Sequence, residues 1–210
     1  MLRGKKASRQ RALRIYFATD LHGSEVCFRK FLAAAKVYEA DVIILGGDFA
    51  GKAIVPVLTE NGTLRARVGG EDVTVPESEW DRLAANLGKQ IDEMLEQVPS
   101  GQPCILNLHC PPYASGLDEA PELDDTLKPV IRGGRPSIIP VGSHAVREAI
   151  KRYQPVVGLH GHIHESRGAQ KIGRTLCVNP GSDYSSGVLR GAVIDIAQDG
   201  SCLDFLLTTG

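Results

Sequence analysis

Residues 13–48 decide the fold, and they read LRIYFATDLHGSEVCFRKFLAAAKVYEADVIILGGD. The segment opens with a short run of strand-forming residues at 13–19 and closes with a continuous apolar run at 42–45. Between them, residues 25–40 place apolar side chains at spacings of three and four, which predicts an amphipathic helix. A strand, a helix and a second strand in this order predict a parallel pair with a right-handed crossover. The run at 42–45 is typical of a strand that is buried on both faces.

The rest of the chain continues to alternate helices and strands. We predict helices over Trp80–Val98 and Ser143–Tyr153, and strands over residues 104–108, 155–159, 175–179, 188–197 and 202–208. Residues 52–76 predict short strands joined by turns at Asn61–Gly62 and Gly69–Gly70, and Asp199–Gly200 predicts another turn. Residues 111–142 are rich in proline and glycine and lack periodicity, which is typical of a functional loop. These elements predict an α/β fold, a sandwich of mixed sheets flanked by helices.

Length and composition limit the number of domains and the classes of function that the chain can have. The 210 residues carry a net charge of −1, which argues against a nucleic-acid partner. No apolar run approaches the roughly 18 residues of a membrane span. The five cysteines form no C-x-x-C pair, so we expect free thiols and a cytoplasmic location. We expect a basic, flexible tail over residues 1–12 and a single domain over residues 13–210, whose oligomeric state the sequence leaves open.

Histidine and aspartate collect where the predicted strands end. The candidate metal ligands at four strand ends are Asp20, His22, Asp48, His109, His162 and His164. Ligands bind outside the carboxyl ends of strands in open α/β sheets, so these side chains should meet at one edge. A lone histidine or aspartate is usually a hydrogen-bonding loop residue or a turn former, but coincidence at four strand ends favours a metal site. His160 lies within the fourth strand, and we expect it to support the site or contact substrate rather than bind metal.

Imidazole and carboxylate ligands together suit borderline divalent ions such as Mn, Fe, Zn, Ni and Co. Six ligands exceed the need of one tetrahedral ion, and a carboxylate can bridge two ions because its two oxygens carry separate lone pairs. Two ions roughly 3.5–4 Å apart form a clamp for in-line displacement at phosphorus. The sequence therefore predicts a two-metal site that acts on a phosphate ester.

The pattern D-x-H, G-D, strand-end H and G-H-x-H resembles the calcineurin-like metallophosphoesterase superfamily. It is carried in order by Asp20–His22, Gly47–Asp48, His109 and Gly161–His164. Asn179–Ser182 also resembles the segment that commonly follows G-H-x-H in this superfamily. The resemblance runs from about Arg14 to Thr208 and implies an αββα-type sandwich.

The resemblance also implies a role for each position. Asp20, His22 and His164 would hold one metal, and His109 and His162 would hold the other. Asp48 would bridge the two ions, which makes Asp48, His109 and His162 the expected catalytic set. A hydroxide between the ions would then attack phosphorus directly in a small phosphomonoester or phosphodiester.

One family motif is missing, since no Gly-Asn dipeptide occurs anywhere in the chain. In the family, this G-N-H/D segment lies between the positions of Asp48 and His109, and its asparagine completes the second metal shell. The join near residues 80–87 therefore suggests that the fold is truncated in its middle. An alternative function is a metal-binding scaffold with impaired catalysis. Asn107 is a conceivable substitute ligand, although we rather expect it to be a buried amide bonded to backbone. Arg132 and Arg135 could bind substrate phosphate or belong to a solvated loop.

Overall fold

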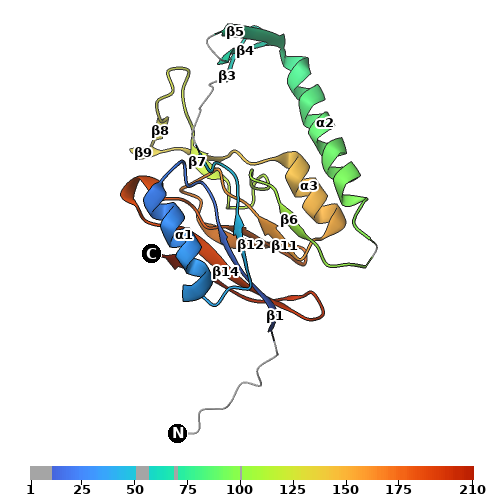
Figure 1. The fold of residues 1–210 in the computed structure, drawn as a ribbon. Coiled ribbons are helices and arrows are strands. Elements are labelled where there is room, and N and C mark those ends of the chain that lie inside the picture. Colours follow the sequence, from blue (N-terminus) through green and yellow to red (C-terminus); the bar gives the residue numbers. More distant parts are fainter. Residues whose placement is uncertain (1–10, 51–56, 69–70, 100) are drawn as a thin grey trace.

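The computed structural model of the chain describes residues 11–50, 57–68, 71–99 and 101–210 (Figure 1). Its first sheet has the strand order β15-β14-β1-β2, formed by β15 (Cys202–Thr209), β14 (Arg190–Ala197), β1 (Arg11–Ala18) and β2 (Val42–Leu45). β1 and β2 are parallel, as predicted, with Ile15 opposite Val42. β14 runs antiparallel to both of its neighbours.

The second sheet has the strand order β12-β13-β11-β6. Its strands are β12 (Gly168–Ile172), β13 (Thr175–Asn179), β11 (Val157–Leu159) and β6 (Ile105–Asn107). β6, β11 and β13 are parallel, and only β12 is antiparallel to its neighbour. Both sheets therefore contain a parallel pair whose carboxyl ends carry predicted ligands.

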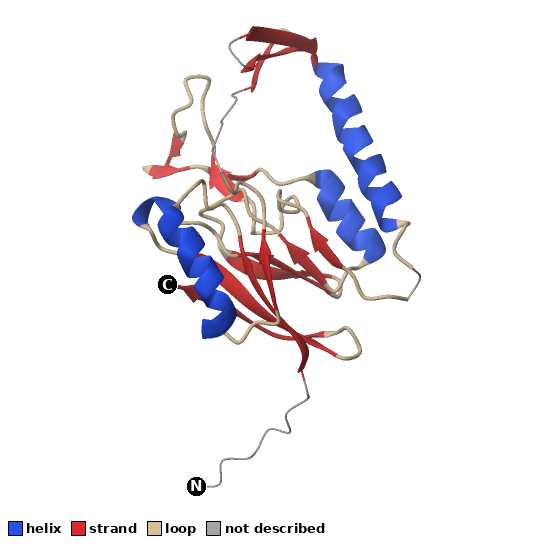
Figure 2. Ribbon diagram, viewed as in Figure 1, coloured by secondary structure: helices blue, strands red, loops and turns tan. Residues whose placement is uncertain are grey.

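Apolar side chains from the two sheets form a shared core, which includes the fully buried Phe17, Leu159 and Ile194. Helix α1 (Glu25–Val37) packs on the outer face of the first sheet through Cys27 and Phe31. Helix α3 (His144–Tyr153) and the C-terminal part of α2 (Glu77–Leu95) pack on the outer face of the second sheet. Figure 2 shows the strands enclosed between helices on two sides. The predicted αββα sandwich is confirmed.

Serine side chains begin two of the helices. Ser24 accepts a hydrogen bond from the backbone N–H of Cys27, and Ser143 accepts one from Val146, as was predicted for α3. These bonds satisfy amide groups that a helix start otherwise leaves unpaired. None of the helices in the described part of the chain is long and apolar enough to cross a membrane.

A three-stranded antiparallel meander stands away from the sandwich and joins it through α2 (Figure 1). Its strands are β3 (Val57–Glu60), β4 (Thr63–Val68) and β5 (Glu71–Pro76). Asn61 and Gly62 both have positive φ, which confirms the predicted turn. The predicted turn at residues 69–70 lies outside the described residues. Helix α2 runs unbroken through residues 80–87, so the suspected join lies inside a continuous helix.

Several expectations about individual elements were wrong or hold only in part. The expectation that β2 is buried on both faces holds in part: Ile44 packs against the shared core and Ile43 and Leu45 pack on the α1 side, whereas Val42 is 42% exposed. β2 is an edge strand, paired only with β1 among the described residues. β1 begins at Arg11, inside the predicted tail, and α1 ends at Val37 instead of Ala40. Leu87 of α2 is exposed, although the periodicity placed it on the buried face.

Residues 111–142 also contain regular structure that the sequence did not predict. Short antiparallel pairs join β7 (Glu119–Pro121) to β10 (Ile138–Pro140) and β8 (Ile131–Arg132) to β9 (Arg135–Pro136). The buried carboxylate of Asp118 accepts hydrogen bonds from the backbone N–H groups of Ala114, Ser115 and Gly142. The Asp118 carboxylate therefore links the beginning and the end of this loop by hydrogen bonds.

Candidate metal centre

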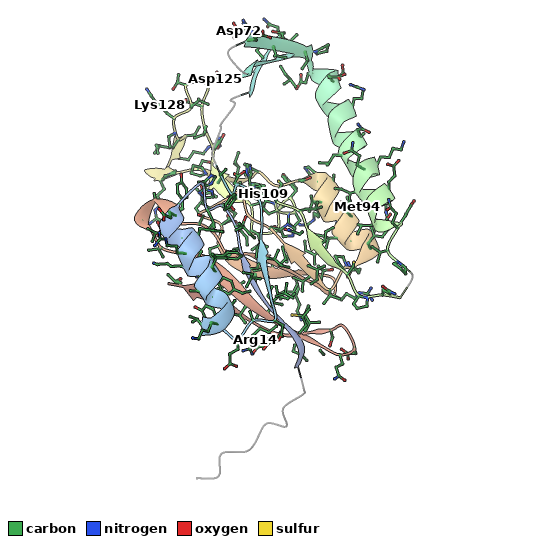
Figure 3. The ribbon with its side chains drawn as sticks, viewed as in Figure 1. Arg14, Asp72, Met94, His109, Asp125 and Lys128 are labelled. Carbon is green, nitrogen blue, oxygen red and sulfur yellow. The ribbon has the colours of Figure 1, made fainter. Side chains whose placement is uncertain are left out.

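The loops after β1, β2, β6 and β11 meet at one end of the sandwich. His109, which follows β6, lies there near the upper ends of the strands in Figure 3. All six predicted ligands are brought together, in two groups. The first group is Asp20, His22 and His164, and the second is Asp48, His109 and His162. Within each group, one potential ligand atom per residue lies within 4.8 Å of the others.

The first group has the dimensions of a coordination shell. His164 Nε2 lies 3.1 Å from His22 Nε2 and 3.2 Å from Asp20 Oδ1. His22 Nε2 lies 3.8 Å from the same carboxylate oxygen. Two ligands bound at about 2.1 Å from one ion stand about 3.0–3.4 Å apart in octahedral or tetrahedral geometry. These side chains therefore fit around one divalent ion with small adjustments.

The carboxylate of the second group, from Asp48, also lies near a histidine of the first group. Asp48 Oδ2 lies 3.5 Å from His109 Nε2 and 3.9 Å from His22 Nε2, so it stands between histidines of both groups. Asp20 Oδ1 likewise lies 3.4 Å from His109 Nε2. Both ring nitrogens of His109 are buried without a hydrogen-bond partner among the described residues. Since buried polar atoms are normally satisfied, a cation at Nε2 would explain one of these two nitrogens.

Backbone hydrogen bonds hold the ligand loops in register. In the first sheet, Asp20 N–H donates to Gly47 O, and His22 N–H donates to Asp48 O. In the second sheet, Gly161 N–H donates to His109 O over 2.8 Å. The two sheets are joined at the site because His162 N–H donates to the Asp20 carboxylate, at 3.1 Å from Oδ2 and 3.3 Å from Oδ1.

Four of the six candidate ligands have a left-handed backbone conformation, which residues other than glycine rarely adopt. Asp20, His22, Asp48 and His162 have φ values of 55°, 47°, 51° and 66°. Such left-handed residues cost about 1–3 kcal/mol each and persist where the surroundings fix them. This strain gathers where the candidate ligands converge, which is the pattern of a functional site.

Two glycines, Gly47 and Gly161, lack a side chain at positions where a candidate ligand from the other sheet packs against the backbone. A Cβ at Gly47 would lie 2.5 Å from His109 Nδ1. A Cβ at Gly161 would overlap Asp20 Oδ2 and would lie 2.6 Å from Thr19 Oγ1. The glycines of the G-D and G-H-x-H motifs therefore allow ligands from opposite sheets to approach.

The family model of the calcineurin-like phosphoesterase superfamily domain matches residues 13–196. The chain belongs to this superfamily. Two solved structures of low identity are similar to it. TT1561 of Thermus thermophilus is 18% identical over 94% of this chain and 98% of that chain, with a TM-score of 0.45. YfcE, a phosphoesterase from E. coli, is 14% identical over 92% of this chain and 98% of that chain, with a TM-score of 0.32. No curated protein sequence matches the chain.

Two residues near the candidate site of this superfamily member were missed by sequence reasoning. The Tyr184 ring, in the short 3-10 helix η1 (Tyr184–Ser186), lies 4.5 Å from the His22 ring and 5.9 Å from the His164 ring. Ser182 Oγ donates to Asp20 O over 2.7 Å. The N-P-G-S segment marked the neighbourhood of Ser182, but the sequence holds no signal for Tyr184.

His160 is placed differently from its predicted ligand neighbours. Its side chain is buried in the core, and Nδ1 lies 2.8 Å from Leu108 O. Burial lowers the pKa of His160 to about 4, so the imidazole is neutral. A side chain with 1% exposure offers no surface to a substrate, so the expected substrate contact is not supported. The alternative, support of the adjacent His109 loop, agrees with the hydrogen bond to Leu108.

The structure does not gather the remaining candidates into the metal centre. Arg132 Nη2 lies 2.9 and 3.1 Å from the two carboxylate oxygens of Glu122, so its charge already has a partner. Arg135 is exposed on the β8–β9 hairpin. Asn107 is exposed on the edge strand β6 instead of buried. A phosphate contact by Arg132 or Arg135 stays a prediction.

Proposed function

We propose that this chain is a metal-dependent phosphoesterase that uses two divalent ions to hydrolyse a small phosphomonoester or phosphodiester. The observation that carries the proposal is the pair of adjacent three-ligand groups with the Asp48 carboxylate between them. When bound, the ions would lower the pKa of a water and neutralise charge on the phosphate. The near-zero net charge of −1 favours a small substrate over nucleic acid.

Each ligand has a distinct task in this proposal. Asp20, His22 and His164 would hold one ion, and His109 and His162 would hold the other. Asp48 would serve both, since it stands between His22 and His109. The five free cysteines fit a reducing compartment, and we therefore propose a cytoplasmic location.

A specific observation favours a second candidate function. The chain has no Gly-Asn dipeptide and Asn107 is exposed, and the second group contains three ligands among the histidine, cysteine, aspartate and glutamate residues that the structure describes. An incomplete second ligand set of this kind is expected of a scaffold that binds metal but does not hydrolyse a substrate. The choice between enzyme and scaffold rests on whether water completes the second shell well enough for catalysis.

Activity during metal titration separates the two candidates. The metal-free protein is titrated with Mn²⁺, and hydrolysis of bis-p-nitrophenyl phosphate and p-nitrophenyl phosphate is followed. We expect hydrolysis of at least one ester to rise with Mn²⁺ and to disappear with a chelator. Metal binding without any turnover would contradict the enzyme proposal and support the scaffold.

We also expect the two ions to bind in separate steps. The first-group side chains of Asp20, His22 and His164 are 1%, 2% and 18% exposed, whereas those of Asp48 and His109 are 37% and 27% exposed. Side chains that are already ordered and shielded from water bind an ion more tightly, because they lose less conformational entropy when the ion binds. Calorimetric titration with Mn²⁺ should show a tight first equivalent and a weaker second one. Two Mn²⁺ equivalents of equal affinity would contradict the expected difference between the two groups.

A further inference from the structure

Asn179 is the last residue of β13, and its side chain is completely buried. The amide Nδ2 donates to Ile163 O at 2.9 Å and to Leu117 O at 3.2 Å, and it lies 3.5 Å from Gly161 O. The amide oxygen accepts from Gly181 N–H at 2.9 Å. One buried amide thus contacts two segments that are distant in sequence, at Leu117 and at Gly161–Ile163, and also the turn that follows its own strand.

Two of these segments, at Ile163 and Gly181, adjoin the candidate metal centre, and the third, at Leu117, belongs to the loop that follows His109. Ile163 lies between His162 and His164, one ligand from each group. Gly181 precedes Ser182, whose hydroxyl donates to Asp20 O. Leu117 adjoins Asp118, the carboxylate that organises the loop leading away from His109.

We propose that Asn179 is a positioning residue, which fixes the loop of His162 and His164 so that both groups can bind metal. This inference rests on the proposed function. His162 has a φ of 66°, a conformation that persists only where the surroundings hold it. The bond from Asn179 to the next residue, Ile163, supplies this restraint. Without it, the loop relaxes and the imidazoles of His162 and His164 move apart from their partners.

The chain offers a matched control on the same strand. Thr175 is the first residue of β13, is also completely buried, and donates from Oγ1 to Pro155 O over 2.6 Å. Asn179→Ala and Thr175→Val each remove a buried bond from a side chain to a backbone carbonyl. The two changes lie at opposite ends of one strand, and only Asn179 lies at the ligand end.

The test is calorimetric titration of the metal-free full chain with Mn²⁺, for the wild type and both variants. We expect both variants to lower Tm, because each leaves buried acceptors unpaired. Asn179→Ala should weaken Mn²⁺ binding by roughly 10–100-fold, as loss of groups that orient metal ligands typically does. Thr175→Val should bind Mn²⁺ as the wild type does. The visible absorption bands of Co²⁺-loaded protein should change only in Asn179→Ala, since they report ligand geometry.

The outcomes are distinct. Wild-type Mn²⁺ affinity and an unchanged Co²⁺ spectrum in Asn179→Ala would overturn the inference, as would an equal loss in Thr175→Val. A wild-type protein that binds no Mn²⁺ would overturn the proposed function itself. If Asn179→Ala does not fold, the same titration is made with Asn179→Ser. The shorter serine side chain can replace only part of the hydrogen bonds that the Asn179 amide makes. We expect an intermediate loss of affinity in Asn179→Ser, and wild-type affinity there would overturn the inference.

Discussion

Asp48→Asn is expected to reduce hydrolysis of bis-p-nitrophenyl phosphate by roughly a thousandfold or more, since several kcal/mol of metal-derived stabilisation would be lost. Asp48 is the carboxylate that lies between His22 and His109, and an amide carries no charge to hold two cations together. Its side chain is 37% exposed, so the change should leave the fold intact. The measurement is kcat/KM at saturating Mn²⁺, together with the circular dichroism spectrum.

Asp72→Asn is the matched control for this substitution. Asp72 is an exposed aspartate of β5, at the far end of the meander in Figure 3. We expect it to retain wild-type kcat/KM, because it lies outside both ligand groups. Turnover that survives in Asp48→Asn would mean that the reaction does not use this carboxylate.

Gly161→Ala is expected to abolish metal binding by displacing a ligand from another sheet. The new methyl group would overlap the Asp20 carboxylate and approach Thr19 Oγ1 to 2.6 Å. Asp20 and Thr19 are both buried, so neither side chain can swing into solvent. Overpacking of this kind costs typically about 1–3 kcal/mol of stability. Calorimetry should show no tight Mn²⁺ equivalent, and thermal melting should show a lower Tm.

Gly88→Ala provides the corresponding control for an added methyl group. Gly88 lies in α2, and among the side chains that the structure describes the nearest atom to an added Cβ would be Ala145 Cβ, at 4.0 Å. Alanine in a helix interior is more favourable than glycine by about 1 kcal/mol, so this variant should be slightly more stable. Its Mn²⁺ affinity should be unchanged. A Gly161→Ala protein that binds Mn²⁺ as tightly as Gly88→Ala would contradict the steric account.

The clustering of the candidate ligands was predictable in part, because parallel strands of one sheet end at the same edge. Once residues 13–48 indicate a parallel pair, the polar residues after each strand must lie at the same edge of a sheet. The rule groups Asp20 with Asp48 in the first sheet and His109 with His162 in the second. The meeting of ligands from the two sheets, such as Asp20 and His164, is seen only in the structure. The structure adds the positive φ values, which periodicity cannot reveal.

Other features depend on neighbours that a local pattern does not report. The apolar run of β2 specifies a strand but not whether both edges are paired, so its edge position was missed. Strands of two or three residues, such as β8 and β9, are too short to show an alternating pattern. Asn179 bonds to backbone carbonyls of Leu117 and Ile163, and carbonyls carry no sequence signature.

The positions of bound manganese ions would show whether the two ligand groups form a two-metal site. Anomalous diffraction at the manganese absorption edge from crystals grown with Mn²⁺ would locate the ions. We predict two peaks roughly 3.5–4 Å apart. One should lie among Asp20, His22 and His164, and the other among Asp48, His109 and His162. Well-ordered crystals without a peak among these residues, or with Mn²⁺ bound only elsewhere, would contradict the account.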